Sequence, residues 1–281
     1  MKNAVLCLLG IMTFPLGADE NIFAWKTGDF EVYTLVENRG PGRQGVLVGA
    51  AAADVERYLG GGFQSQTNAF LIKASGRIVL VDTGFGAALF DNLKALGVNP
   101  GQVDAVLITH MHGDHIGGLA RDGQALFPNA RVYLAEQERG YWTKSNMNRS
   151  AVAALAPYGE KVTVFRPGEL GKAVPEILPG ISAAAAFGHT PGHTVFLLES
   201  REEKLLIWGD LVHVQGIQFP LPGVSVTYDT DPREAAVSRK RILSYVTANG
   251  IPVAGMHLVY PALGTVRAEG DGYRLEDAKR N

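Results

Sequence analysis

The chain of 281 residues has a single cysteine, Cys7, so it cannot form an internal disulfide. The sequence also lacks an excess of either charge. Its net charge is −2, and the lysine and arginine residues are scattered along the chain. This pattern argues against a nucleic-acid surface. The only dense basic run, residues 238–241, lies in a predicted helix, where such a run usually forms a solvated face. The sequence also lacks repeats, low-complexity linkers and a Gly-x-Ser-x-Gly nucleophile motif.

The N-terminal residues 4–18 carry no charge, follow Lys2 and precede Asp19 and Glu20. A short basic start, an apolar centre and small residues before a polar segment are typical of a secretory signal. The stretch is shorter than the roughly 20 residues of a membrane-spanning helix; the alternative is an N-terminal core strand or helix. We therefore expect a signal peptide over 1–18, a single domain over 19–281, a periplasmic or secreted location and no membrane association. Removal of the signal would also remove Cys7.

Composition and periodicity indicate an α/β enzyme. The chain is 46% hydrophobic and 19% charged, which is ordinary for a globular protein. Short apolar runs alternate with segments of helical spacing, as expected for buried sheets flanked by helices. Strands are predicted at 30–36, 69–73, 77–81, 103–109, 130–134, 161–165, 195–199, 204–208 and 252–256, and helices at 87–96 and 232–249.

The last of these helices has the clearest boundaries. Asp231 is a favourable N-cap, Pro232 suits the first helical position, and Glu234 is placed to complete a capping box. Gly250 is expected to end the helix.

The densest chemical signal is the hexapeptide His110-Met111-His112-Gly113-Asp114-His115, which holds three of the seven histidines. Imidazole is a poor core filler, because each buried ring needs hydrogen-bond partners. Imidazole nitrogen and carboxylate oxygen are, however, the atoms that zinc and its first-row neighbours bind. The hexapeptide therefore predicts a metal site.

Four further motifs follow apolar segments: Val81-Asp82-Thr83-Gly84, Gly188-His189-Thr190-Pro191-Gly192-His193, Trp208-Gly209-Asp210 and Gly255-Met256-His257. With the hexapeptide they occur in the order typical of one family, and the chain resembles the metallo-β-lactamase superfamily. The resemblance implies a four-layer αββα sandwich with two mixed β-sheets and a two-metal site between them.

The resemblance also implies roles for individual residues. His110, His112 and His189 would hold the first metal, Asp114, His115 and His257 the second, and Asp210 would bridge both. Asp82 and His193 would orient the site without binding metal. Two divalent ions are expected, with zinc first and manganese, iron or cobalt as alternatives. A hydroxide between the ions would attack the substrate, and Asp114 would relay a proton to the leaving group.

Differences from particular branches of the family reduce the number of reactions to consider. Asp210 and the lack of a usable cysteine disfavour β-lactam hydrolysis. His112, where glutamate would stand, disfavours flavodiiron oxygen reductases, and the charge balance disfavours nucleases. The tail 255–264 is most similar to methyl parathion hydrolase-like aryl esterases and phosphotriesterases, and the chain as a whole resembles the methyl parathion hydrolase-like and lactonase branch. We expect a hydrolase acting on an ester, lactone or phosphotriester of a small molecule.

Three alternatives stay open. A glyoxalase II-like thioesterase ranks lower, because only about two dozen residues follow His257. A persulfide dioxygenase-like oxidoreductase would use a similar ligand set with a single iron. A non-enzymatic metal-binding scaffold would be expected to lack ligands, and none of the seven is missing.

Substrate selection is expected to lie in variable loops. Residues 140–142 are predicted to begin a lid, and the apolar residues 215–222 to line the mouth of the cleft. The candidates for the pocket wall are Phe85, Trp142, Phe219 and Tyr260. His213, three residues after Asp210, either contacts substrate or is structural. A homodimer also stays open.

Overall fold

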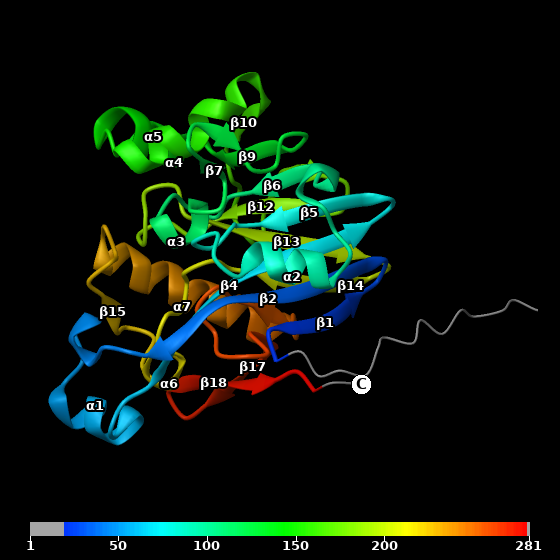
Figure 1. Ribbon diagram of the computed structural model, residues 1–281. Helices are drawn as coiled ribbons and strands as arrows, with labels where there is room; N and C mark the ends of the chain where they lie inside the picture. The colour runs from blue at the N-terminus through cyan, green and yellow to red at the C-terminus, as the bar shows by residue number, and fades with distance from the viewer. Residues whose placement is uncertain (1–19, 280–281) are drawn as a thin grey trace, which may run out of the picture.

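The computed structural model describes residues 20–279, so the predicted signal peptide lies outside the described residues. Two seven-stranded sheets lie face to face at the centre (Figure 1). The first has the order β1 (Ile22–Thr27), β2 (Phe30–Pro41), β4 (Gln64–Ala74), β5 (Arg77–Val81), β6 (Ala105–Leu107), β9 (Arg131–Ala135) and β10 (Val162–Phe165). The second has the order β11 (Glu176–Leu178), β12 (Ile181–Ala185), β13 (Thr194–Ser200), β14 (Glu203–Ile207), β16 (Val253–Ala254), β17 (Leu263–Glu269) and β18 (Gly272–Asp277).

Both sheets are mixed. Strands β5, β6, β9 and β10 run parallel, as do β14 and β16, whereas the remaining neighbours within the two sheets are antiparallel. Two short ribbons lie outside the sheets: β3 (Leu47–Val48) with β15 (Ser225–Val226), and β7 (Ala120–Arg121) with β8 (Gln124–Ala125).

The helices and helical turns are α1 (Ala52–Leu59), α2 (Leu89–Ala95), α3 (Gly113–Ile116), α4 (Glu136–Gly140), α5 (Arg149–Leu155), α6 (Gln215–Gln218), α7 (Pro232–Asn249), η1 (Gln44–Val46), η2 (Pro100–Gln102), η3 (Tyr141–Ser145) and η4 (Ala156–Lys161). Across residues 20–279, no helix is both long and apolar enough to cross a membrane.

Strand β5 shows why the protein has four layers. Side chains alternate along a strand, so Val81 points toward the second sheet while Leu80 points to the opposite face, where Leu89 and Leu93 of α2 cover it. Because both faces are buried over residues 79–81, the strand is apolar from Ile78 to its end. Helix α7 covers the outer face of the second sheet, so the predicted αββα sandwich is confirmed.

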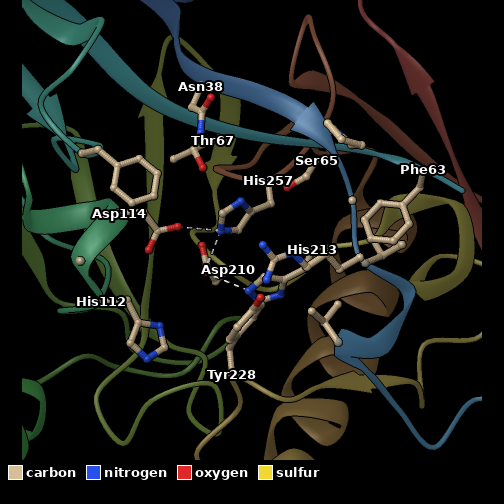
Figure 2. A pocket seen from close by; sticks show the side chains of 17 residues that line it. Asn38, Phe63, Ser65, Thr67, His112, Asp114, Asp210, His213, Tyr228 and His257 are labelled. Carbon is tan, nitrogen blue, oxygen red and sulfur yellow. Dashed lines mark hydrogen bonds and ion pairs between the residues drawn. The ribbon is translucent and has the colours of Figure 1, made fainter.

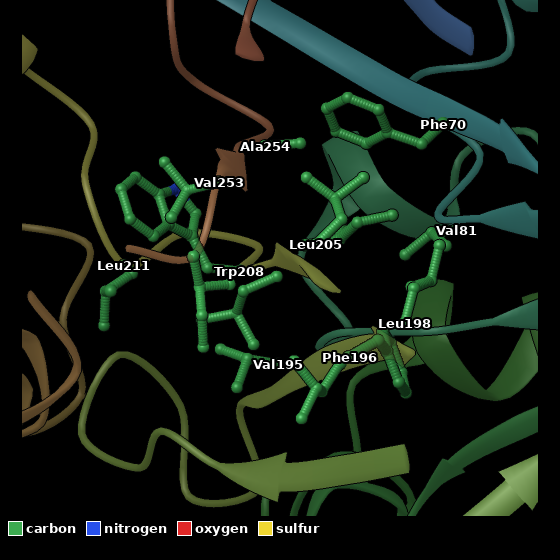
Figure 3. Close-up of a cluster of buried hydrophobic side chains, with 14 of the residues drawn as sticks. Phe70, Val81, Val195, Phe196, Leu198, Leu205, Trp208, Leu211, Val253 and Ala254 are labelled. Carbon is green, nitrogen blue, oxygen red and sulfur yellow. The ribbon is translucent and has the colours of Figure 1, made fainter. Parts of the chain in front are cut away.

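Between the sheets, Phe70 and Val81 of the first sheet belong to the same buried cluster as Phe196, Leu198 and Leu205 of the second (Figure 3). Each of these side chains is fully buried. Burial of one such side chain contributes about 1.5–3 kcal/mol, so this layer provides a rigid base for the loops above it.

The strands predicted at 69–73 and 77–81 are confirmed and form the antiparallel hairpin β4–β5, and those predicted at 195–199 and 204–208 form the hairpin β13–β14. Strand β6 is shorter than predicted and ends at Leu107. Thr109 donates its backbone N–H to Asp82 Oδ1 at 2.8 Å rather than to a neighbouring strand. The chain therefore leaves the sheet just before His110.

Helix α7 begins and ends as predicted, but its capping box forms only in part. Asp231 Oδ1 accepts from the N–H groups of Arg233 and Glu234, and Gly250 ends the helix with a φ of 62°. The backbone N–H of Asp231 donates to the carbonyl of Gly188 at 2.8 Å. This bond uses the donor that Glu234 would have accepted and joins the helix to the loop that carries His189.

The prediction of a solvated face for residues 238–241 is wrong at Ser238 and Arg239, which are buried. Arg239 donates to the carbonyl oxygens of Leu211, Pro222 and Val224. A buried guanidinium with several acceptors fixes the loop that follows Asp210 instead of facing solvent.

Candidate metal centre

Loops from both sheets meet at one end of the sandwich. His110 follows β6, Asp210 follows β14 and His257 follows β16, while His189 lies between β12 and β13. The polar side chains therefore come from rigid strand ends, and the apolar runs before them explain their positions.

Three imidazole nitrogens form the first cluster. His110 Nε2 lies 3.0 Å from His112 Nδ1 and 3.2 Å from His189 Nε2, and the latter two atoms are 3.0 Å apart. Tetrahedral zinc with Zn–N distances of 2.0–2.1 Å separates its ligand atoms by about 3.3 Å. Asp210 Oδ2 completes the group at 3.2 Å from His189 Nε2. These four donors fit a first-row metal ion.

The second cluster lies beside the first and shares Asp210. His115 Nε2 is 3.1 Å from Asp210 Oδ1 and 3.7 Å from Asp114 Oδ1, and His257 Nε2 is 3.5 Å from Asp114 Oδ2. Within residues 20–279, His115 Nε2 and Asp210 Oδ1 are buried without a hydrogen bond of good geometry. Orphaned buried polar atoms in such a cluster indicate a missing ligand, and a cation satisfies both.

The ring nitrogens facing away from the clusters bind acceptors. Oxygen atoms of a carboxylate or carbonyl accept the Nδ1–H, which leaves the Nε2 lone pair directed into the site. The three pairs are His115 Nδ1 with Asp82 Oδ2 at 2.6 Å, His189 Nδ1 with Asp229 Oδ1 at 2.8 Å, and His257 Nδ1 with the Gln66 carbonyl at 2.8 Å.

Asp82 lies where the resemblance placed it. It is fully buried, and its oxygens accept from the N–H and hydroxyl of Thr109 as well as from His115. It thus joins the end of β5 to the start of the histidine loop.

The titration properties of His110, His112 and Asp210 favour cation binding. Burial and the nearby His115 hold the pKa of His110 well below its usual range, and burial with His189 lowers the pKa of His112 to about 3. Although burial acts in the opposite direction, the charge of His115 holds the pKa of Asp210 well below its usual range. Neutral imidazoles at His110 and His112 beside an ionised Asp210 are the protonation states that a metal ion binds. Although burial acts in the opposite direction, nearby carboxylates raise the pKa of His115 and His257, and that of His189 to about 9, so metal binding to these three rings displaces protons.

His193 makes backbone contacts and no contact to the first cluster through its nitrogens. Its Nδ1 donates to the Ala186 carbonyl at 2.9 Å, and its Nε2 accepts from the backbone N–H of Asp210 at 3.0 Å. Gly209 has a φ of 58°, and a Cβ there would lie 2.6 Å from His193 Nε2. The approach of this histidine therefore requires glycine before Asp210.

His213, whose role the sequence left open, lies in the site. Its Nε2 is 2.9 Å from Asp210 Oδ2, and its ring stacks on that of His257 with centroids 4.8 Å apart. Asp210, His213 and His257 form a further group with metal-binding spacing. His213 is thus an eighth candidate at the centre.

A cavity of about 420 Å³ opens over the clusters (Figure 2). This volume suits a small molecule. The floor contains His112, Asp114, Asp210, His213 and His257. The walls contain Asn38, Pro41, Gly42, Arg43, Val46, Phe63, Ser65, Thr67, Phe85, Gly113, Val214 and Tyr228.

Of the aromatic residues predicted to line the pocket, only Phe85 does so, and its side chain is 50% exposed. The prediction is wrong for Phe219, which is buried and packs 6.1 Å from the Trp208 ring in the core. Tyr260 lies outside the cavity lining and packs edge-on against Phe23 at 6.0 Å.

Trp142 does not line the cavity but packs against His112. Its ring packs edge-on against His112 with centroids 5.4 Å apart, and its Nε1 donates to Glu138 Oε1. Residues 140–142 therefore belong to the packed α4–η3 segment and do not form the predicted lid. Residues 215–222, predicted to line the mouth of the cleft, begin with α6, where Ile217 and Gln218 are buried. None of these residues is among those that line the cavity.

Sequence reasoning missed the segment between β2 and β4, which supplies Arg43, Val46 and Phe63 to the cavity. It also missed Tyr228 and the buried Glu138. The first segment has no periodic motif, and Tyr228 lies in a loop next to Asp229, which binds His189. No local pattern identifies these residues.

Comparisons with known proteins agree with this geometry. The family model of the metallo-beta-lactamase superfamily matches residues 62–249. The Anti-Pycsar protein Apyc1 of Saccharibacillus brassicae is 37% identical over 86 residues, which cover 30% of this chain and 32% of that relative. The chain thus spans about a third of the length of this curated relative.

Two solved structures are similar over nearly the whole chain. Hydrolase AbOPH, described as a member of the beta lactamase superfamily, has a TM-score of 0.83 and 27% identity, covering 93% of this chain and 98% of that one. AidC, described as a dizinc quorum-quenching lactonase in complex with a product, also has a TM-score of 0.83, with 24% identity and coverage of 93% and 99%.

Proposed function

Because this chain belongs to the metallo-beta-lactamase superfamily, we propose that it is a dinuclear metal-dependent hydrolase of small esters, lactones or phosphotriesters. The observation that carries the proposal is the position of Asp210. Its Oδ1 faces His115 of the second cluster, and its Oδ2 lies 3.2 Å from His189 of the first cluster and 3.0 Å from His257 of the second. A carboxylate shared in this way can bridge two ions.

We assign His110, His112 and His189 with Asp210 to one ion, and Asp114, His115 and His257 with Asp210 to the other. When bound, two divalent cations acidify a water molecule and polarise the substrate oxygen. Zinc is the proposed metal, with manganese, iron or cobalt as alternatives that histidine and carboxylate donors also accept.

Asp114 is the side chain that we expect to transfer a proton during the reaction. Asp114 has a side chain that is 24% exposed to the cavity, so its Oδ2 can reach a bound molecule. Burial opposes ionisation, but the charges of His115 and His257 lower the pKa of Asp114. We propose that Asp114 orients the attacking water and passes its proton to the leaving group.

The cavity walls support the substrate class. Phe63 and Phe85 offer apolar surface to an acyl or aryl group, whereas Arg43 and Tyr228 offer hydrogen-bond donors to an ester, lactone or phosphoryl oxygen. The lactonase AidC, which shares the fold and was solved with an acyl-homoserine product, indicates one class of substrate to test first.

The experiment combines metal analysis with an activity panel on the metal-replete protein. We expect two equivalents of metal per chain and hydrolysis of an aryl ester, an acyl-homoserine lactone or a phosphotriester. A β-lactam and a glutathione thioester serve as comparisons, the latter testing the glyoxalase II alternative. One iron per chain with oxygen uptake would instead support a persulfide dioxygenase, and full activity of the metal-free protein would refute the proposal.

We also propose that the protein is exported, acts on a small molecule and binds no nucleic acid. The uncharged stretch 4–18 and the net charge of −2 support these statements. Mass spectrometry of the protein from cell fractions tests export: a mature chain that retains Lys2 in the cytoplasm contradicts it.

A further inference from the structure

Glu138 is a buried carboxylate in α4, directly after β9 of the first sheet. Its side chain is fully buried. A carboxylate is costly to remove from water unless several donors satisfy it, and an apolar side chain would fill the same space at a lower cost. The contacts of Glu138 therefore call for an explanation.

Four donors meet the two oxygens. Oε1 accepts from the backbone N–H of Met111 at 2.8 Å and from Trp142 Nε1–H at 2.6 Å. Oε2 accepts from the Thr190 hydroxyl at 2.7 Å and from the backbone N–H of Gly192 at 2.9 Å. Each oxygen thus holds two donors, and each pair of donors includes one backbone N–H.

Three of these donors come from the two loops that supply the first cluster, and the fourth, Trp142, lies in η3. Met111 lies between His110 and His112, while Thr190 and Gly192 follow His189 closely in the chain. The first loop belongs to the first sheet, and the second loop joins β12 to β13 of the second sheet. One carboxylate therefore links both halves of the sandwich next to the metal donors.

The loop around Gly192 is seated directly on α4. A Cβ at position 192 would lie 2.3 Å from the backbone nitrogen of Glu138. Only glycine permits this approach, so the loop is held at contact distance from the Glu138 backbone as well as from its side chain.

From these contacts we propose that Glu138 is a positioning residue that sets the separation of His110, His112 and His189, and thereby the affinity of the first metal. The inference rests on the proposed metal binding by these histidines and is independent of the substrate. Glu138 also accepts a hydrogen bond from Trp142, whose indole ring packs against the imidazole of His112. Glu138 therefore helps to hold this metal-binding ring in place.

The second cluster has separate supports. Asp82 holds His115, and the Gln66 carbonyl holds His257. Glu138 contacts neither of these histidines. A change at Glu138 is therefore expected to affect one metal equivalent. A change at Asp82 is expected to affect chiefly the other, because Asp82 binds His115 directly and reaches His110 only through Thr109.

The test measures metal affinity directly. Zn²⁺ is titrated against a chromophoric chelator, and Co²⁺ absorption spectra report the donor geometry, for the wild type, Glu138→Gln and Asp82→Asn. The amide in Glu138→Gln cannot accept from both pairs of donors, so one equivalent is expected to bind about 10–100-fold more weakly while the other changes by less than about 3-fold. Asp82→Asn is expected to weaken the opposite equivalent, and the double variant to weaken both.

Thr190→Val provides a milder variant that removes one donor and keeps the side-chain shape. It should weaken the same equivalent as Glu138→Gln and alter the Co²⁺ spectrum, even if Glu138→Gln fails to fold. Glu136→Gln is the matched control, because Glu136 lies in the same helix but is exposed and pairs with Arg166. Unchanged affinity in Thr190→Val, or an equal loss of both equivalents in the folded variants, would overturn the proposal.

The readout separates this inference from the proposed function. A protein that hydrolyses none of the panel but shows selective loss of one metal equivalent would contradict the function and support the role of Glu138. Suppose instead that the wild type is active with two metal equivalents and that neither Glu138→Gln nor Thr190→Val changes metal affinity. This result would support the proposed function and contradict the role of Glu138.

Discussion

The backbone N–H of Asp210 donates to His193 Nε2 at 3.0 Å, while the opposite nitrogen of that ring donates to the Ala186 carbonyl. His193 therefore fixes the residue proposed to bridge two metals, while both of its ring nitrogens bind backbone groups and neither is directed at the metal donors. Since all of these groups are buried, the contact supports both stability and metal binding.

His193→Ala is accordingly expected to lower the free energy of unfolding by about 1–3 kcal/mol, because it leaves the Asp210 N–H buried without an acceptor. Urea denaturation of the metal-free protein measures this. Glu199→Ala, which changes an exposed side chain of the adjacent strand β13, is the control. Equal midpoints for His193→Ala and the wild type would contradict the role.

Asp210→Asn is expected to abolish turnover and reduce the bound metal below two equivalents, while the fold persists. The amide keeps the side-chain size but offers one oxygen in place of two, so it cannot serve both clusters. Metal content, near-ultraviolet circular dichroism and the rate on the best substrate are measured together. Retention of two equivalents and of activity would refute the bridging role.

The metal donors could be proposed from the sequence because the motifs that carry them resemble those of a known family in order and spacing. His110, Asp210 and His257 each lie three residues after the end of an apolar strand, which explains how the fold brings these motifs together. Prediction from the sequence failed at Phe219, because the sequence shows that a residue is aromatic but not whether a helical turn directs it into the core. The turn at α6 decides that, and it depends on packing with Leu59 and Val224.

Long-range contacts were beyond prediction for a different reason. Glu138 is defined by four donors from three separated segments, and Arg239 by carbonyls of two loops. Neither residue has a local pattern that distinguishes it from a solvent-facing charge on a helix. Their burial follows from tertiary packing, which one sequence does not reveal.

His213→Phe is expected to lower turnover by about 10–100-fold. The change keeps a planar ring against His257 but removes the nitrogen that lies 2.9 Å from Asp210 Oδ2. His213→Gln places an amide near the same position and should recover part of the rate. Steady-state kinetics and metal content of both variants provide the measurement, and equal rates for the two variants would exclude a polar role.

Tyr228→Phe tests whether the cavity hydroxyl contacts substrate. Tyr228 lines the cavity and is 53% exposed, so loss of its hydroxyl should leave stability unchanged. One hydrogen bond contributes about 0.5–1.5 kcal/mol, which corresponds to a decrease in kcat/KM of about 2–10-fold. Tyr273→Phe on β18 is the control. An unchanged kcat/KM in Tyr228→Phe would show that the hydroxyl does not engage the substrate.

Phe85 and Phe219 offer a paired test of the cavity boundary. Phe219→Ala empties a fully packed position beside Trp208 and is expected to cost about 3–5 kcal/mol of stability. Phe85→Ala removes a half-exposed ring from the cavity wall, so the free energy of unfolding should change little while KM rises for substrates with a long acyl or aryl group. Denaturation and kinetics are measured on both variants. The opposite pattern, with Phe85→Ala unfolding readily and Phe219→Ala altering only KM, would show that the wall of the site is formed by α6 and not by the loop after β5.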